Sequence, residues 1–161
     1  MELKKLFIIL NGFDEKLVEK KGNKVIICQE DNKIIDQDCT LLQTDYYSLE
    51  DLVKAEQIIN KQLSPLNEII IINKNVDLNM ISYQYDYQNI KDNYLKLANL
   101  YFFINLLIKS FNKKLDFTLS FEKYSHYKVH TNIFNESLTK YLEILKKDLK
   151  DSHLISIKIL N

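Results

Sequence analysis

The chain contains no arginine, and its lysine and acidic residues balance at 22 each. A net charge of zero creates no field that would attract the protein to nucleic acid or to a membrane surface. Arginine is also the side chain that binds phosphate through two parallel hydrogen bonds, so its absence argues against anion recognition. We therefore expect neither nucleic acid nor a membrane as a partner.

Long apolar runs are missing as well. The longest apolar stretch, 97–108, is interrupted by Asn99 and Asn105 and is too short to span a bilayer. The amino-terminal apolar run, Leu6–Leu10, comes without a small-residue cleavage site, so we expect no signal peptide. These absences predict a soluble, cytoplasmic protein.

Metal-binding patterns are also scarce. The two cysteines, Cys28 and Cys39, lack metal-ligand spacing and are expected to be free thiols in a reducing compartment. His126 and His130 lie four residues apart and can share a helix face, but the sequence shows no third ligand beside them. We expect no metal site.

The most informative stretch that is present is Glu68-Ile-Ile-Ile-Ile-Asn73. A strand with one face in water would alternate apolar and polar residues. An unbroken run of isoleucine is instead typical of a parallel strand that is covered on both faces. The stretch predicts the central strand of an α/β sheet.

Strands and helices alternate around this stretch. Apolar runs predict strands at 6–10, 24–28, 39–43, 115–120 and 154–160, and amphipathic patterns predict helices at 15–21, 49–63, 90–111 and 127–149. This alternation predicts a three-layer, Rossmann-like, doubly wound parallel sheet of six strands in the order 3-2-1-4-5-6, within a single domain over 1–161. A parallel crossover needs a dozen or so residues, so the short connection 32–38 leaves an antiparallel third strand as the alternative.

Several motifs resemble the short-chain dehydrogenase/reductase family. Leu41-Leu-Gln-Thr-Asp45, followed by a helix that Ser48 can cap, is similar to the third strand and the D-V-T-D turn of that family. The stretch Leu66–Asn75, which ends in Asn73-Lys-Asn75, is similar to the strand that closes in N-N-A-G. Tyr124-Ser-His-Tyr-Lys128 fits the Y-x-x-x-K pattern. The resemblance covers nearly the whole chain and implies a Rossmann-type fold.

The resemblance also implies a catalytic set of four residues, Asn93, Ser120, Tyr124 and Lys128. In the family, the tyrosine is the general acid/base, and the lysine lowers its pKa and holds the nicotinamide ribose. The serine positions the substrate carbonyl, and the asparagine holds a proton-relay water.

A second alignment of the Y-x-x-x-K pattern remains open. Matching the later helix through Ser137-Leu-Thr139 puts Lys128 at the tyrosine position and Asn132 at the lysine position. The stretch Tyr87–Lys91 also fits the pattern. The sequence does not decide between these alignments.

The loop after the first strand departs from the family. A dinucleotide fold needs glycines here so that the backbone can approach the pyrophosphate, whereas Asn11-Gly-Phe-Asp-Glu-Lys16 has a single glycine. Asp14 and Glu15 would place carboxylates where phosphates bind, and that is repulsive. We expect no NAD(P) binding, and predict a degenerate, non-catalytic domain that acts through protein contacts. The alternative is a minimal NAD(P)-dependent oxidoreductase acting on a carbonyl or an alcohol.

The partner is predicted from the longest helix. Its segment Leu100–Ile108 is apolar around more of its circumference than one sheet can cover. Members of the resembled family commonly associate by packing the two corresponding helices into a four-helix bundle. We therefore expect a homodimer, or pairing with a dehydrogenase-like protein, through helices 90–111 and 127–149.

Overall fold

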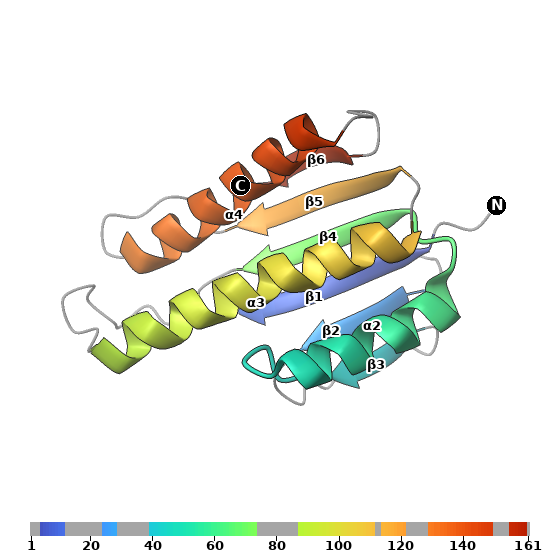
Figure 1. Ribbon diagram of the computed structural model, residues 1–161, viewed down its shortest axis with the longest axis horizontal. Coiled ribbons are helices and arrows are strands. Elements are labelled where there is room, and N and C mark those ends of the chain that lie inside the picture. Colours follow the sequence, from blue (N-terminus) through green and yellow to red (C-terminus); the bar gives the residue numbers. More distant parts are fainter. Residues whose placement is uncertain are drawn as a thin grey trace.

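The computed structural model describes residues 4–11, 24–28, 39–73, 87–111, 114–121, 129–149 and 155–160. Within these ranges, six strands form one sheet and three helices pack against it (Figure 1). The strands are β1 (Lys5–Asn11), β2 (Lys24–Cys28), β3 (Cys39–Gln43), β4 (Glu68–Asn73), β5 (Leu115–Phe121) and β6 (Ile155–Leu160). The helices are α2 (Leu49–Leu63), α3 (Tyr87–Phe111) and α4 (Val129–Asp148).

The sheet has the strand order β3-β2-β1-β4-β5-β6, and every neighbouring pair is parallel. The chain builds outward from β1 to β3 on one side and from β4 to β6 on the other, which is the arrangement of a doubly wound sheet. The predicted fold class and strand order are confirmed. The third strand is parallel to the second, so the antiparallel alternative is wrong.

The isoleucine run occupies the position that its pattern predicts. In β4, Ile69–Ile72 are at most 2% exposed, and the strand lies between β1 and β5. Side chains of alternate residues point to opposite faces of a strand, so burial of all four residues requires cover on both faces. The prediction of a central strand is confirmed.

The strands carry one apolar cluster on each face of the sheet. The larger cluster joins Leu6, Ile8 and Leu10 of β1 to residues of all three described helices, and we call this side the helical face (Figure 1). The smaller cluster lies on the opposite face and contains Phe7, Ile9, Ile26, Cys28, Ile70 and Ile72. The helix predicted at 15–21 falls outside the described residues.

The helix boundaries follow local signals. The side chain of Ser48 accepts a hydrogen bond from the amide of Asp51 at 3.2 Å, as the predicted N-cap of α2 requires. Helix α3 begins at Tyr87, three residues before the predicted start at Ile90. Helix α4 begins at Val129, and the two residues that were predicted to precede it lie outside the described ranges.

Helix α3 divides its large side chains between the core and the surface. Phe103 and Leu107 are fully buried in the core on the helical face, whereas Phe102 is 39% exposed. The expectation that apolar residues on this helix remain exposed is therefore met by Phe102 and not by Phe103 or Leu107. None of the described helices is long and apolar enough to cross a membrane.

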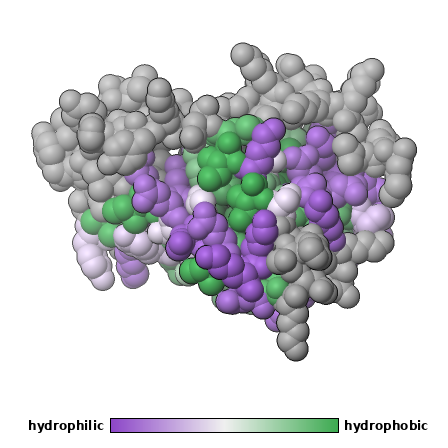
Figure 2. Space-filling model, turned by 90° about the horizontal axis from the view of Figure 1, so that it is seen from above, coloured by the Kyte–Doolittle hydropathy of each residue, from purple (hydrophilic) through white to green (hydrophobic). Residues whose placement is uncertain are grey.

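Figure 2 shows the molecule from the side of α4 and β6. Hydrophobic side chains gather in the middle of this view, with hydrophilic side chains beside and below them. The strand β6 forms this end of the sheet order.

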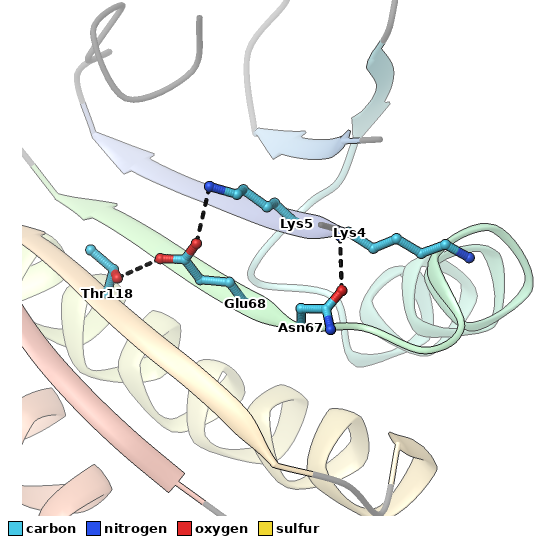
Figure 3. Close-up of polar contacts among 5 residues, drawn as sticks. All are labelled: Lys4, Lys5, Asn67, Glu68 and Thr118. Atoms are coloured by element: carbon cyan, nitrogen blue, oxygen red, sulfur yellow. Dashed lines mark hydrogen bonds and ion pairs between the residues drawn. The ribbon is translucent and has the colours of Figure 1, made fainter. Parts of the chain in front are cut away.

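A charged cluster joins the amino ends of β1 and β4 to the middle of β5 (Figure 3). Nζ of Lys5 on β1 lies 3.2 Å from Oε2 of Glu68 on β4. The hydroxyl of Thr118 on β5 donates to Oε1 of the same glutamate at 2.7 Å. The backbone amide of Lys4 donates to Oδ1 of Asn67 at 2.9 Å. Functional sites of such sheets lie at the other, carboxyl edge, so we interpret this cluster as structural.

Candidate functional site

The candidate site is the carboxyl edge of the sheet, where the strands end. In doubly wound folds, ligands bind in the crevice beyond this edge, at the point where the strand order reverses. That point lies between β1 and β4, whose last paired residues are Asn11 and Asn73. The turn after β3, the first half of α3 and the first half of α4 contribute the side chains described here.

Tyr46 lies beneath this edge. Two features of the turn after β3 position it: the amide of Thr44 donates to the carbonyl of Cys28 at 2.8 Å, and Oδ1 of Asp45 accepts from the amide of Tyr47 at 2.9 Å. Tyr46 itself is 1% exposed, and its hydroxyl lies 2.9 Å from the carbonyl oxygens of both Ile9 and Ile27. A phenol has one proton, so it donates to one of these carbonyls at a time.

The electrostatic environment keeps this phenol neutral. Burial raises the pKa of Tyr46 well above its usual value, and the nearby thiol of Cys28 acts in the same direction. Tyr46 is therefore a structural hydrogen-bond donor that joins the ends of β1 and β2 at neutral pH.

Lys96 on α3 contacts both Tyr46 and the end of β1. Its Nζ donates to the carbonyl oxygen of Leu10 at 3.2 Å and lies 5.3 Å from the centre of the Tyr46 ring, within the range of a cation–π contact. One turn further along the helix, Nδ2 of Asn99 donates to the carbonyl oxygen of Tyr46 at 3.0 Å. Both side chains are buried. The helix α3 is thus tied to the end of β1 and to the turn after β3.

A buried amide pair closes the neighbouring strand. Nδ2 of Asn73, at the end of β4, donates to Oδ1 of Asn135 on α4 at 2.6 Å. Both residues are buried, so this hydrogen bond gives each side-chain amide a partner inside the protein.

Of the four residues that the resemblance implies, two are in the described part of the structure. Asn93 lies half-buried in the first half of α3, beside a hollow of about 10 Å³ that Tyr94, Leu97 and Phe134 also line. Such a volume accommodates no more than one water molecule. Tyr124 and Lys128 lie outside the described residues.

Ser120 is on β5, where it pairs with Ile72 of β4. The side chain is 1% exposed. Phe117 and Leu119 belong to the cluster on the helical face, so strand alternation directs Ser120 to the opposite face. Strand alternation thus turns the Ser120 side chain away from α3, the helix that carries Asn93.

Sequence reasoning missed Tyr46, Lys96, Asn99 and Asn135. A signal was present for two of them: Lys96 and Asn99 are polar residues three positions apart on the apolar face of a long helix. Polar side chains on a buried helix face need hydrogen-bond partners inside the protein. This pattern therefore indicates a helix that packs against polar backbone atoms. No metal site was predicted. Among the described residues, the structure contains no group of three His, Cys, Asp or Glu side chains that could hold a metal ion.

Neither a protein-family model nor a curated protein sequence matches the chain. Solved structures do. A short chain dehydrogenase from Leptospira borgpetersenii serovar Hardjo-bovis with bound NAD+ has a TM-score of 0.74 at 10% sequence identity, over 98% of this chain and 70% of that one. The chain has the fold of the short-chain dehydrogenases and reductases.

Two further structures with this dehydrogenase fold give the same result. A 3-ketoacyl-(acyl-carrier-protein) reductase from Brucella melitensis, complexed with NADH, has a TM-score of 0.71 at 11% identity, over 99% of this chain and 75% of that one. A Bacillus cereus enoyl-acyl carrier protein reductase with NADP+ has a TM-score of 0.65 at 11% identity, over 99% of this chain and 73% of that one. At these identities the likeness concerns the fold alone.

Proposed function

We propose that the chain is a non-catalytic domain with the dehydrogenase fold that acts through protein–protein contacts. The observation that carries this proposal is the burial of Ser120, which is 1% exposed and lies on the face of the sheet opposite α3. A serine that positions a substrate carbonyl must have its hydroxyl within hydrogen-bond reach of the substrate. A fully buried hydroxyl does not meet this requirement.

The residues at the carboxyl edge also fit a dinucleotide poorly. In a dinucleotide fold, the backbone after the first strand approaches the pyrophosphate across a glycine-rich turn. Here the carbonyl of Leu10 is hydrogen-bonded by Lys96, and the stretch Asn11–Lys16 contains a single glycine, Gly12. The next charged residues, Asp14 and Glu15, are acidic and repel a pyrophosphate. The residues at this edge therefore do not fit NAD(P).

Calorimetric titration with NAD+, NADH, NADP+ and NADPH tests the absence of cofactor binding. We expect no saturable heat for any of them. A dissociation constant of about 10 μM or tighter, which corresponds to about 7 kcal/mol of binding, would overturn the proposal. Ionic strength is varied in parallel, because non-specific attraction of a polyanion to lysines weakens with salt.

The contact surface that we propose lies on α3 and α4. Large apolar side chains on the outer sides of these helices are exposed: Tyr94, Leu95 and Phe102 on α3, and Ile133 and Ile144 on α4. Leu95 and Phe102 are seven residues apart, so they lie on the same side of α3, two turns from one another. Fully burying a large apolar side chain contributes about 1.5–3 kcal/mol, so these partly exposed residues favour association.

The two helices present this surface as one unit. The rings of Tyr101 on α3 and Tyr141 on α4 stack with their centroids 4.0 Å apart and an angle of 17° between their planes. The hydroxyl of Tyr141 also donates to the carbonyl oxygen of Tyr101 at 3.2 Å. Because this contact fixes α3 against α4, a partner meets a preorganised surface.

Light scattering measures the predicted association. We expect the wild-type chain at micromolar concentration to have twice the chain mass, and Phe102→Asp to shift it toward the monomer. The matched control is Ile58→Asp on α2, since Ile58 is 38% exposed and Phe102 is 39% exposed. A folded monomer for the wild type would exclude the homodimer and leave pairing with a different protein of the same fold.

The second candidate function is an NAD(P)-dependent oxidoreductase acting on a carbonyl or an alcohol. It is supported by the fold, by neighbours that bind NAD+, NADH or NADP+, and by the one-water hollow beside Asn93. If titration detects a nucleotide, turnover assays with Tyr124→Phe follow. Loss of turnover in that variant would support this function and the first alignment of the Y-x-x-x-K pattern.

A further inference from the structure

Among the described residues, the strand β6 stands at one end of the sheet order. It pairs with β5, and no other strand among the described residues pairs with it. An edge strand presents a row of backbone donors and acceptors that another strand can pair with.

The side chains of β6 differ between the two faces of the sheet. Ile157 packs against the core on the helical face, and Ile159 on the same face is 45% exposed. Ser156 and Lys158 lie on the opposite face, where the hydroxyl of Ser156 donates to Oδ1 of Asp116 on β5. The side chain of Asp116 is about half exposed. The edge therefore has an apolar row on one face, and a lysine beside an aspartate on the other.

This pattern is complementary to itself. We propose that β6 pairs antiparallel with β6 of a second copy, about a two-fold axis that passes through Ile157. In this register Ile157 meets Ile157 of the second copy, and Ser156 lies opposite Lys158. Lys158 is then two strand spacings, about 9–10 Å between backbones, from Asp116 of the other copy. Extended side chains cover that distance, so two lysine–aspartate contacts form across the axis.

Charge and alternation favour this register over the one centred on Lys158. Residues directly opposite one another in an antiparallel pair have their side chains on the same face of the sheet. A two-fold axis perpendicular to the sheet meets this condition only if one residue of β6 lies opposite the same residue of the second copy. Moving the axis by one residue to Lys158 places the two lysines directly opposite one another, which is destabilising. The axis through Ile157 instead pairs isoleucine with isoleucine and separates the like charges. The result is one continuous sheet through both copies.

This surface differs from the outer surface of α3 and α4, so the two associations can be tested separately. The experiments use the full chain with Phe102→Asp, which removes the proposed helix contact, and with Cys39→Ser, which leaves only the buried Cys28. In this background the proposal predicts a residual dimer at high protein concentration. A folded monomer across the whole concentration series would overturn it.

Disulfide trapping tests the register. Residues directly opposite one another in an antiparallel pair have Cβ atoms about 4.5–5.5 Å apart, close enough for a disulfide with little adjustment. Ile157→Cys should therefore form a reducible dimer under mild oxidation. Ile159→Cys is the matched control, because its two introduced thiols would lie about 13 Å apart along the strands, too far to link. Equal trapping at both positions, or none with Ile157→Cys, would overturn the proposal.

Charge reversal tests the cross-axis contacts. Lys158→Asp and Asp116→Lys should each weaken the residual dimer by about tenfold, because two attractive pairs become repulsive. The double variant, Lys158→Asp with Asp116→Lys, restores opposite charges and should recover most of the affinity. Thermal unfolding confirms that each variant is folded. Failure of the double variant to recover affinity would show that the lysine and the aspartate do not meet across the axis, which the proposal requires.

Discussion

At the scale of single residues, Tyr46 shows how one side chain closes the edge where ligands bind in this fold. Its hydroxyl serves carbonyls of two strands, its own carbonyl accepts from Asn99, and Lys96 lies over its ring. Each of these polar groups is satisfied within the chain. A buried tyrosine held in this way is worth more to stability than its apolar area alone.

Replacing this tyrosine should therefore destabilise the fold. Tyr46→Phe keeps the ring but leaves two buried carbonyls without their hydroxyl partner, which should cost about 1–3 kcal/mol. Urea unfolding followed by circular dichroism measures this loss. The control is Tyr94→Phe, because Tyr94 is exposed. An equal effect of both substitutions would contradict the role assigned to the Tyr46 hydroxyl.

The same variant should change the pH dependence of stability. Because burial raises the pKa of Tyr46 above its usual value of 10.0, the folded chain keeps the phenolic proton at a pH where the unfolded chain loses it. This contribution to stability is complete below pH 10 and decreases as the pH rises above that value. The alkaline decrease should be shallower in Tyr46→Phe than in the wild type.

At the scale of secondary-structure elements, the charged cluster that joins the amino ends of β1 and β4 to the middle of β5 sets how these strands align. Lys5 pairs directly with Glu68 in the register of β1 and β4, and Thr118 reaches the same carboxylate from β5 (Figure 3). Slipping either strand by one residue would turn these side chains to the other face. Apolar runs specify register poorly, since most neighbours along them are isoleucines, so a polar contact of this kind adds specificity.

Glu68→Gln should destabilise the sheet. The glutamine removes the charge that faces Lys5, whose side chain is only 10% exposed, while the hydrogen bond from Thr118 can persist. We expect a loss of about 1–3 kcal/mol in the free energy of unfolding. Glu50→Gln on α2 removes an exposed ion pair with Lys54 and should have no measurable effect. Denaturant unfolding of both variants side by side decides whether the cluster stabilises the sheet.

The element scale also explains what could be predicted about α3. Its existence follows from a long apolar pattern, and it begins at Tyr87, three residues before the predicted start at Ile90. Which residues face inward does not follow from that pattern. The helix is apolar on several sides, so only contact with the sheet distinguishes Phe103 in the core from Phe102 on the surface.

At the scale of the whole molecule, two surfaces are proposed to mediate association. One is the outer side of α3 and α4, and the other is the edge strand β6. Both are proposed to contact copies of this chain, and both two-fold contacts are isologous. A chain that used both would form assemblies larger than a dimer, and variants at one surface would leave the other intact.

The amino-acid sequence determined the fold class and the strand order. The buried isoleucine strand, the spacing of apolar runs and the lack of alternation in them leave a doubly wound parallel sheet as the arrangement that covers both faces. These are local and periodic properties, so they can be read along one chain. The parallel direction of β3 also agreed with the prediction, despite its short connection to β2.

Only the tertiary structure decided how the site residues lie relative to one another. Spacing along the sequence placed Asn93 and Ser120 at the expected distances, but which face a side chain takes depends on strand register and helix packing. The same holds for Tyr46 and Lys96, whose partners are backbone carbonyls of β1 and β2, elements far from both in the sequence. A carbonyl carries no residue-specific signal, so contacts of this kind exist only once the sheet has formed and the helix covers it.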